Sequence, residues 1–119
     1  MDLRIPIKIC KEDKCLNVIA LLNTGFETEE PIISIPPSIA EQLGLGINKA
    51  LEFEGPANLR GLTYISDKVR VIVEQENNIS SIDARAVITP GEDEVVLSDK
   101  CIEGLGIVID LKRRKWWIT

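Results

Sequence analysis

Apolar and polar residues alternate along much of the chain, which is the pattern of half-buried β-strands. In the stretch 4–10, Ile5, Ile7 and Ile9 share one face, and Pro6, which cannot donate a backbone hydrogen bond, indicates an edge strand or a strand start. A charged turn at 11–14 leads to a return strand at 15–22. Further strands are expected at 32–35, 51–53, 62–65, 69–73, 79–88, 94–97, 107–109 and 116–118. The pattern predicts a mostly β chain.

Two short helices interrupt the strands. Pro36 and Pro37 stop the strand at 32–35, and Pro37 suits the first turn of a helix over 38–43, which Gly44 ends. Ser98 is a natural N-cap for a second helix that runs to about Leu105, with Asp99 favourably placed in its first turn and Gly106 at its end.

The two helices belong to an internal echo. The sequence at 41–45 resembles that at 103–107, an offset of 103 − 41 = 62 residues. In both copies a short apolar strand precedes a short helix, a glycine and an apolar residue. The echo is either a chance repeat of Leu-Gly after a helix or the mark of an internally duplicated β fold.

Length and composition limit the possible classes of protein. The 119 residues suffice for one core, no linker is visible, and residues 1–119 are expected to form one domain. The net charge of −5 argues against a nucleic-acid partner. No apolar run approaches the roughly 20 residues of a membrane span, and the first residues lack the form of a signal peptide. We therefore expect no membrane partner and a cytoplasmic location.

The titratable residues exclude several chemistries. The chain has no histidine, which excludes serine–histidine and cysteine–histidine triads within it. The cysteines, Cys10, Cys15 and Cys101, match no zinc spacing, so no metal site is expected. Cys10 and Cys15 can face each other across a hairpin and form a disulfide, but reduced packing cysteines are favoured in a cytoplasmic chain.

The most informative stretch is 20–26, where apolar residues run into the polar turn Asn23-Thr24-Gly25. Such a turn at the end of a buried strand directs small polar side chains to one point. Taken alone it can be an ordinary strand-ending turn. The stretch also resembles the active-site strand and loop of retroviral-type (retropepsin-like) aspartic proteases, whose signature is two apolar residues followed by Asp-Thr-Gly or Asp-Ser-Gly. Asn23 occupies the aspartate position.

The resemblance covers roughly residues 5–118, and its specific parts are 21–26, 39–45 and 95–110. It implies a closed, barrel-like acid-protease fold with one or two short helices, no cofactor, and a homodimer that acts on an extended peptide. The segments 3–9 and 116–118 are the expected interface strands. In a strand at 116–118, Trp116 and Trp117 point to opposite faces, so one can pack on the core and leave the other for the interface.

The resemblance also implies roles for individual residues. Asn23, Thr24 and Gly25 take the catalytic positions, with Thr24 bracing the two loops across the dimer axis and Gly25 allowing close approach of substrate. The expected substrate-binding residues are Phe26, Gly55, Gly61 and Ser98. The loop from Gly55 to Gly61 is the expected flap over the cleft, although it can instead protect a barrel edge. Ser98 stands where the family usually has glycine, and its other interpretation is the helix N-cap.

The substitution at position 23 decides the expected activity. In the family, two aspartates share a proton and activate a water, whereas an asparagine amide cannot accept a proton at ordinary pH. The chain is therefore expected to be an inactive member of a peptidase (hydrolase) lineage. It is either a natural non-catalytic relative or a protease whose aspartate was changed. The alternative functions are a dimeric peptide-binding module without cleavage and a structural dimer without a ligand.

Two charged segments have simpler interpretations. The acidic loop 27–30 is expected to be a solvated loop, although it can also repel acidic substrates. The basic run 112–115 is expected to be a charged hairpin tip rather than a nucleic-acid contact.

Overall fold

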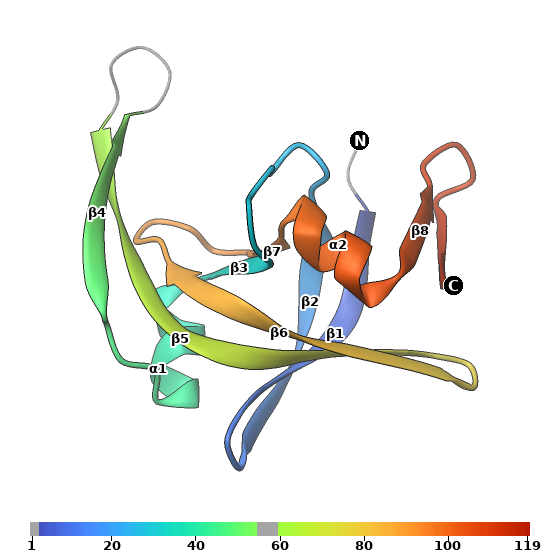
Figure 1. Ribbon diagram of the computed structural model, residues 1–119, viewed down its shortest axis with the longest axis horizontal. Helices are drawn as coiled ribbons and strands as arrows, with labels where there is room; N and C mark the ends of the chain where they lie inside the picture. Colours follow the sequence, from blue (N-terminus) through green and yellow to red (C-terminus); the bar gives the residue numbers. More distant parts are fainter. Residues whose placement is uncertain (1–2, 55–59) are drawn as a thin grey trace.

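The computed structural model describes residues 3–54 and 60–119 and consists mainly of β-strands (Figure 1). The strands are β1 Leu3–Lys11, β2 Lys14–Leu22, β3 Ile32–Ile35, β4 Lys49–Glu54, β5 Arg60–Gln75, β6 Asn78–Ile88, β7 Val95–Leu97, β8 Ile107–Asp110 and β9 Lys115–Ile118. The helices are α1 Pro37–Leu43 and α2 Asp99–Leu105. These elements confirm the predicted mostly β fold with two short helices.

Six strands close into a barrel. Their hydrogen-bonded order is β1-β2-β7-β3-β6-β5, and β5 pairs again with β1 to complete the ring. The strand β4 is added outside the ring as the antiparallel partner of β5, while β8 and β9 form a separate two-stranded sheet. β4 and β8 lie on opposite sides of the molecule (Figure 1). The predicted barrel-like closure is therefore confirmed.

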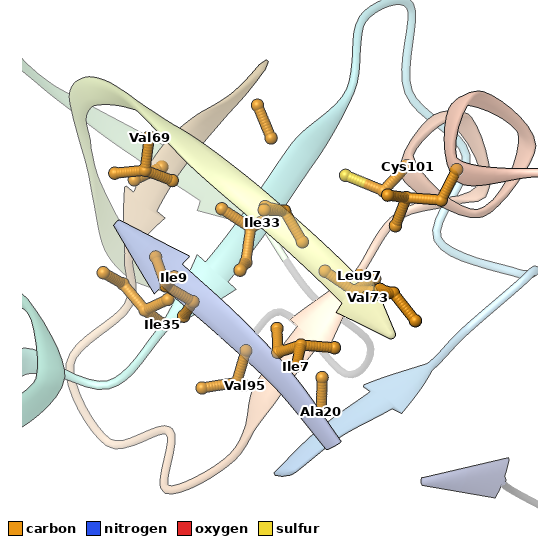
Figure 2. Packing of buried hydrophobic residues seen from close by; sticks show 14 of the residues in the cluster. Ile7, Ile9, Ala20, Ile33, Ile35, Val69, Val73, Val95, Leu97 and Cys101 are labelled. Carbon is orange, nitrogen blue, oxygen red and sulfur yellow. The ribbon is translucent and has the colours of Figure 1, made fainter. Parts of the chain in front are cut away.

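The barrel core consists of the apolar residues that the alternation singled out. Ile5, Ile7 and Ile9 of β1 are all buried, and they pack against aliphatic side chains from β3, β5 and β7. Figure 2 shows Ile33, Ile35, Val69, Val73 and Leu97 gathered in this cluster, with Cys101 of α2 at its margin. Burial of these aliphatic side chains is the main force that holds the barrel together.

Two strand predictions need correction. β1 is an edge strand only in its first half, because it pairs with β2 along its length but with β5 only over Lys8–Cys10. Pro6 is tolerated because it lies outside the pairing with β5. The strands expected at 62–65 and 69–73 form one strand, β5, with a bulge between Ile65 and Lys68. The bulge keeps the chain extended through residues 66 and 67, whose polar side chains look locally like a turn.

The prediction that Cys10 and Cys15 are reduced is also wrong. Cys10 and Cys15 are directly opposite each other in the β1–β2 hairpin, with their Cα atoms 4.1 Å apart, and they form a disulfide. Cys101 is free and buried. The structure therefore has the alternative, a disulfide across the hairpin, because the hairpin register brings the two cysteines together.

The internal echo has a structural counterpart. The two helices are each followed by a glycine in the left-handed conformation, Gly44 and Gly106, both with φ of 70°. The strands before the helices, β3 and β7, pair antiparallel, and Ser34 faces Val96, which is its counterpart in the echo because 96 − 34 = 62. When equivalent positions of two repeats face each other in an antiparallel pair, a local two-fold axis relates the repeats. This pairing supports the internally duplicated fold.

The C-terminal hairpin presents its two tryptophans differently. Trp116 is half-buried and packs against the core, whereas Trp117 is 43% exposed. The basic residues 112–115 are all exposed around the turn between β8 and β9. The predicted opposite orientation of the tryptophans and the charged hairpin tip are both confirmed.

Candidate functional site

The Asn23-Thr24-Gly25 turn follows directly from the end of β2. There β2 runs parallel to β7, with Leu22 opposite Leu97. The backbone amide of Asn23 donates a hydrogen bond to the Leu97 carbonyl at 3.3 Å. All three turn residues are exposed. The end of β2, where Ala20 and Leu22 are buried, thus holds the backbone of Asn23 in place while its side chain remains accessible.

The turn is closed by its own hydrogen bonds. The Gly25 amide donates to Oδ1 of Asn23 at 3.0 Å, and the Phe26 amide donates to the Asn23 carbonyl at 3.1 Å. A carboxylate oxygen accepts such a bond at least as well as an amide oxygen. A Cβ on residue 25 would lie 3.3 Å from Oδ1 of Asn23, a tight contact that glycine avoids. The turn is therefore suited to an aspartate at position 23.

The start of α2 fixes the far side of the same loop. The Asp99 amide donates to the Phe26 carbonyl at 2.9 Å, and the Asp99 carboxylate accepts from the Thr28 amide at 3.0 Å. The sequence pattern identified Asp99 only as a favourable acidic residue in the first helical turn. Its contact with the loop depends on tertiary structure, since 71 residues separate it from Thr28.

Ser98 is fully buried, with 0% of its surface exposed. Its Oγ accepts from the Ile32 amide at 3.1 Å and from the Cys101 amide at 3.4 Å. The N-cap interpretation is confirmed. A side chain with no accessible surface positions the ends of β3 and α2, so we replace the expected substrate contact of Ser98 with this positioning role.

An open pocket of about 450 Å³ adjoins the turn. Its apolar lining comes from Phe26, Ile32, Val87 and Val96. The polar lining residues are Asn23, Thr28, Ser34, Thr63, Thr89 and Glu92. Apolar side chains combined with a limited number of polar groups are the usual composition of a site for an organic ligand.

The structure brings some predicted site residues to this pocket and leaves others aside. Asn23 and Phe26 line it, and Thr24 and Gly25 belong to the same turn without lining it. Gly61 is paired with Phe53 between β5 and β4. Gly55 lies outside the described residues, as does most of the predicted flap loop.

Several lining residues escaped the sequence analysis. Thr63 of β5 and Thr89, just beyond β6, face each other with their hydroxyl oxygens 3.1 Å apart, and Glu92 follows in the loop before β7. Threonines in strands and a glutamate in a loop carry no local signal of a site. Only the pairing of β5 with β6 and the return of the chain into β7 bring them to Asn23.

Other chemistries find little support in the described part of the chain. Residues 3–54 and 60–119 hold no group of three or more histidine, cysteine, aspartate or glutamate residues that could bind a metal ion. Burial raises the pKa of the Cys101 thiol to about 11, which makes it a poor nucleophile. Of the helices in those ranges, none has the length and apolar character needed to cross a membrane.

Comparison with known proteins leaves the site to be interpreted from its geometry. No protein-family model matches this sequence. A search of the curated proteins finds no significant match either.

Proposed function

We propose that this chain is a subunit of a retropepsin-like aspartic peptidase lineage in which Asn23 occupies the catalytic aspartate position, and that it binds extended peptides without cleaving them. The observation that carries the proposal is the position of the Asn23-Thr24-Gly25 turn, which follows the buried end of β2 and borders the pocket of about 450 Å³. The closed barrel, the two short helices and the local two-fold relation of β3 to β7 also support it.

The proposed inactivity follows from acid–base chemistry. Peptide hydrolysis by this family needs one carboxylate to take a proton from water and a second, protonated carboxyl to donate one to the substrate. The side-chain amide of Asn23 has nearly the size of an aspartate carboxylate, and its Oδ1 accepts the hydrogen bond from the Gly25 backbone amide. It cannot, however, accept a proton at ordinary pH. In a homodimer the substitution occurs twice, so no carboxylate remains at the centre. The pocket remains available for binding.

Peptide binding by the unmodified protein tests the proposal. Titration with an extended, mostly apolar peptide should shift the amide resonances of pocket residues such as Phe26, Val87 and Thr89, because these residues line the apolar pocket. The resonances at the exposed turn between β5 and β6 should stay unchanged. Heteronuclear NMR at increasing peptide concentration makes the measurement.

A matched pair of variants on β6 provides the control. Val87→Arg puts a charge in the pocket and should abolish the shifts, whereas Ile79→Arg, at a position that is 68% exposed and outside the pocket, should preserve them. Absence of any peptide-induced shift in the unmodified protein would favour the structural dimer without a ligand.

We further propose that the protein is a homodimer with Asn23 and Thr24 near its two-fold axis. Two features leave room for an interface. β1 pairs with β5 only over Lys8–Cys10, so the first half of β1 is paired with β2 on one side and not with β5 on the other. The side chain of Trp117 is 43% exposed. Sedimentation velocity should show a dimer that Trp117→Lys weakens and Ile79→Lys does not. A monomer at high concentration would contradict this arrangement.

The remaining partner and location expectations stay predictions. The acidic net charge continues to argue against a nucleic-acid partner. A cytoplasmic location has to be reconciled with the Cys10–Cys15 disulfide, because such bonds persist mainly in oxidising compartments.

A further inference from the structure

We propose that the pocket beside Asn23 selects a basic side chain, lysine or arginine, of the bound peptide, with Glu92 as the residue that recognises its charge. The proposal rests on the proposed function, because it names the class of peptide that the same pocket would take.

The first argument is the chemistry of the lining. Glu92 is the one charged residue among the described residues that line this pocket, and the rest are apolar residues, hydroxyl residues and Asn23. Lysine and arginine lay their aliphatic stems along apolar surface and keep the charged head at its edge. A pocket that combines apolar side chains with a single carboxylate fits such a side chain better than it fits a purely apolar one.

The second argument is that the Glu92 carboxylate is not engaged elsewhere in the described structure. Its backbone amide donates to the Thr89 carbonyl at 3.2 Å, which holds the start of the loop. No ion pair or side-chain hydrogen bond of Glu92 occurs within residues 3–54 and 60–119, unlike its neighbour Glu94, which pairs with Arg4 at 2.7 Å. Pairing with Arg4 also lowers the pKa of Glu94. Glu94 therefore has a structural partner, and Glu92 is available for a ligand.

The third argument is the charge around the rim. Thr28 lines the pocket and has Glu27 and Glu29 on either side in sequence, while Asp93 follows Glu92. The described lining contains no lysine or arginine. Arg85 is the nearest basic residue on β6 to the pocket residue Val87. Its Nε lies 3.7 Å from Oε1 of Glu30, with which it forms an ion pair. The charged residues next to the lining residues in sequence are therefore acidic, and acidic side chains near a binding site favour cationic peptides over acidic ones.

The test measures binding to the unmodified Asn23 protein. The probes are fluorescently labelled, mostly apolar peptides that differ at one position, which carries either lysine or norleucine, and that position is moved along the peptide. At one position the lysine peptide should bind about threefold to tenfold more tightly, the range expected for a partly exposed ion pair with hydrogen bonding. Added salt should reduce the difference. Fluorescence anisotropy provides the dissociation constants.

Two charge-matched variants assign the preference to one residue. Glu92→Gln should remove the preference for lysine, whereas Asp93→Asn, which removes the same charge one residue away and outside the pocket lining, should keep most of it. Both side chains are exposed, so both variants should fold, as their NMR spectra can verify. Equal losses in the two variants would overturn a role specific to Glu92.

The outcomes separate this inference from the proposed function. Equal binding of the lysine and norleucine peptides at every position would overturn the basic preference while leaving peptide binding intact. Failure of every peptide to bind would overturn both proposals.

Discussion

The Asn23→Asp protein is expected to cleave extended, mostly apolar peptides that the Asn23 protein leaves intact. The substitution supplies one carboxylate per subunit, and the Gly25 amide that now donates to Oδ1 of residue 23 at 3.0 Å can donate to a carboxylate in the same way. General acid–base catalysis by the restored pair should raise the rate about 10²- to 10⁴-fold over the Asn23 protein. Digestion of a broad peptide library, followed by mass spectrometry, makes the comparison.

The pH dependence of that activity has a definite sign. Two carboxylates close together cannot both ionise readily, so one pKa is raised and the catalytic form with one shared proton exists at acidic pH. Activity should fall as the pH rises and the second carboxyl loses its proton. A statine-type inhibitor, whose hydroxyl mimics the attacked intermediate, should abolish cleavage.

A matched control separates the position of the new carboxylate from its charge. Asn17→Asp places the same group at an exposed position of β2, away from the pocket, and should leave the protein inactive. An inactive Asn23→Asp protein that still binds peptide would identify an old non-catalytic relative. Cleavage by the Asn23 protein itself, after contaminating proteases are excluded, would refute the aspartic mechanism.

The largest loss of stability is expected from Leu97→Ala, at about 2–5 kcal/mol in the free energy of unfolding. Leu97 is 0% exposed, and its strand lies between β2 and β3 in the closed barrel. Truncation removes apolar contacts and leaves a cavity beneath the turn whose first amide, that of Asn23, bonds to the Leu97 carbonyl. Urea unfolding monitored by tryptophan fluorescence gives the free energy, provided that the slope with denaturant is unchanged.

Ile79→Ala is the control for this measurement. It truncates an aliphatic residue of another strand, but Ile79 is 68% exposed, so the change should cost within about 0.5 kcal/mol. Similar costs for the two substitutions would show that Leu97 does not lie in the core.

Local patterns were enough to predict most elements of this protein. Alternation placed β1, β2 and β6 almost to the residue, because one face of each strand must be apolar to be buried. The ends of both helices were predictable because Gly44 and Gly106 adopt a backbone conformation that other residues avoid. The sequence also located the Asn23-Thr24-Gly25 turn, because a small polar motif after a buried strand is itself a local signal.

Contacts between distant segments decided the rest. The closure of β1 onto β5 and the continuity of β5 through its bulge depend on strand pairing between such segments. The Cys10–Cys15 disulfide, by contrast, lies within one hairpin, and the sequence already offered it as an alternative. The apolar face of each strand and the turn geometry restrict the register, but which strands become partners is decided only when the sheet closes. The same reason explains why the contact of Asp99 with Thr28 and the positions of Thr63, Thr89 and Glu92 around the pocket appear only in the folded barrel.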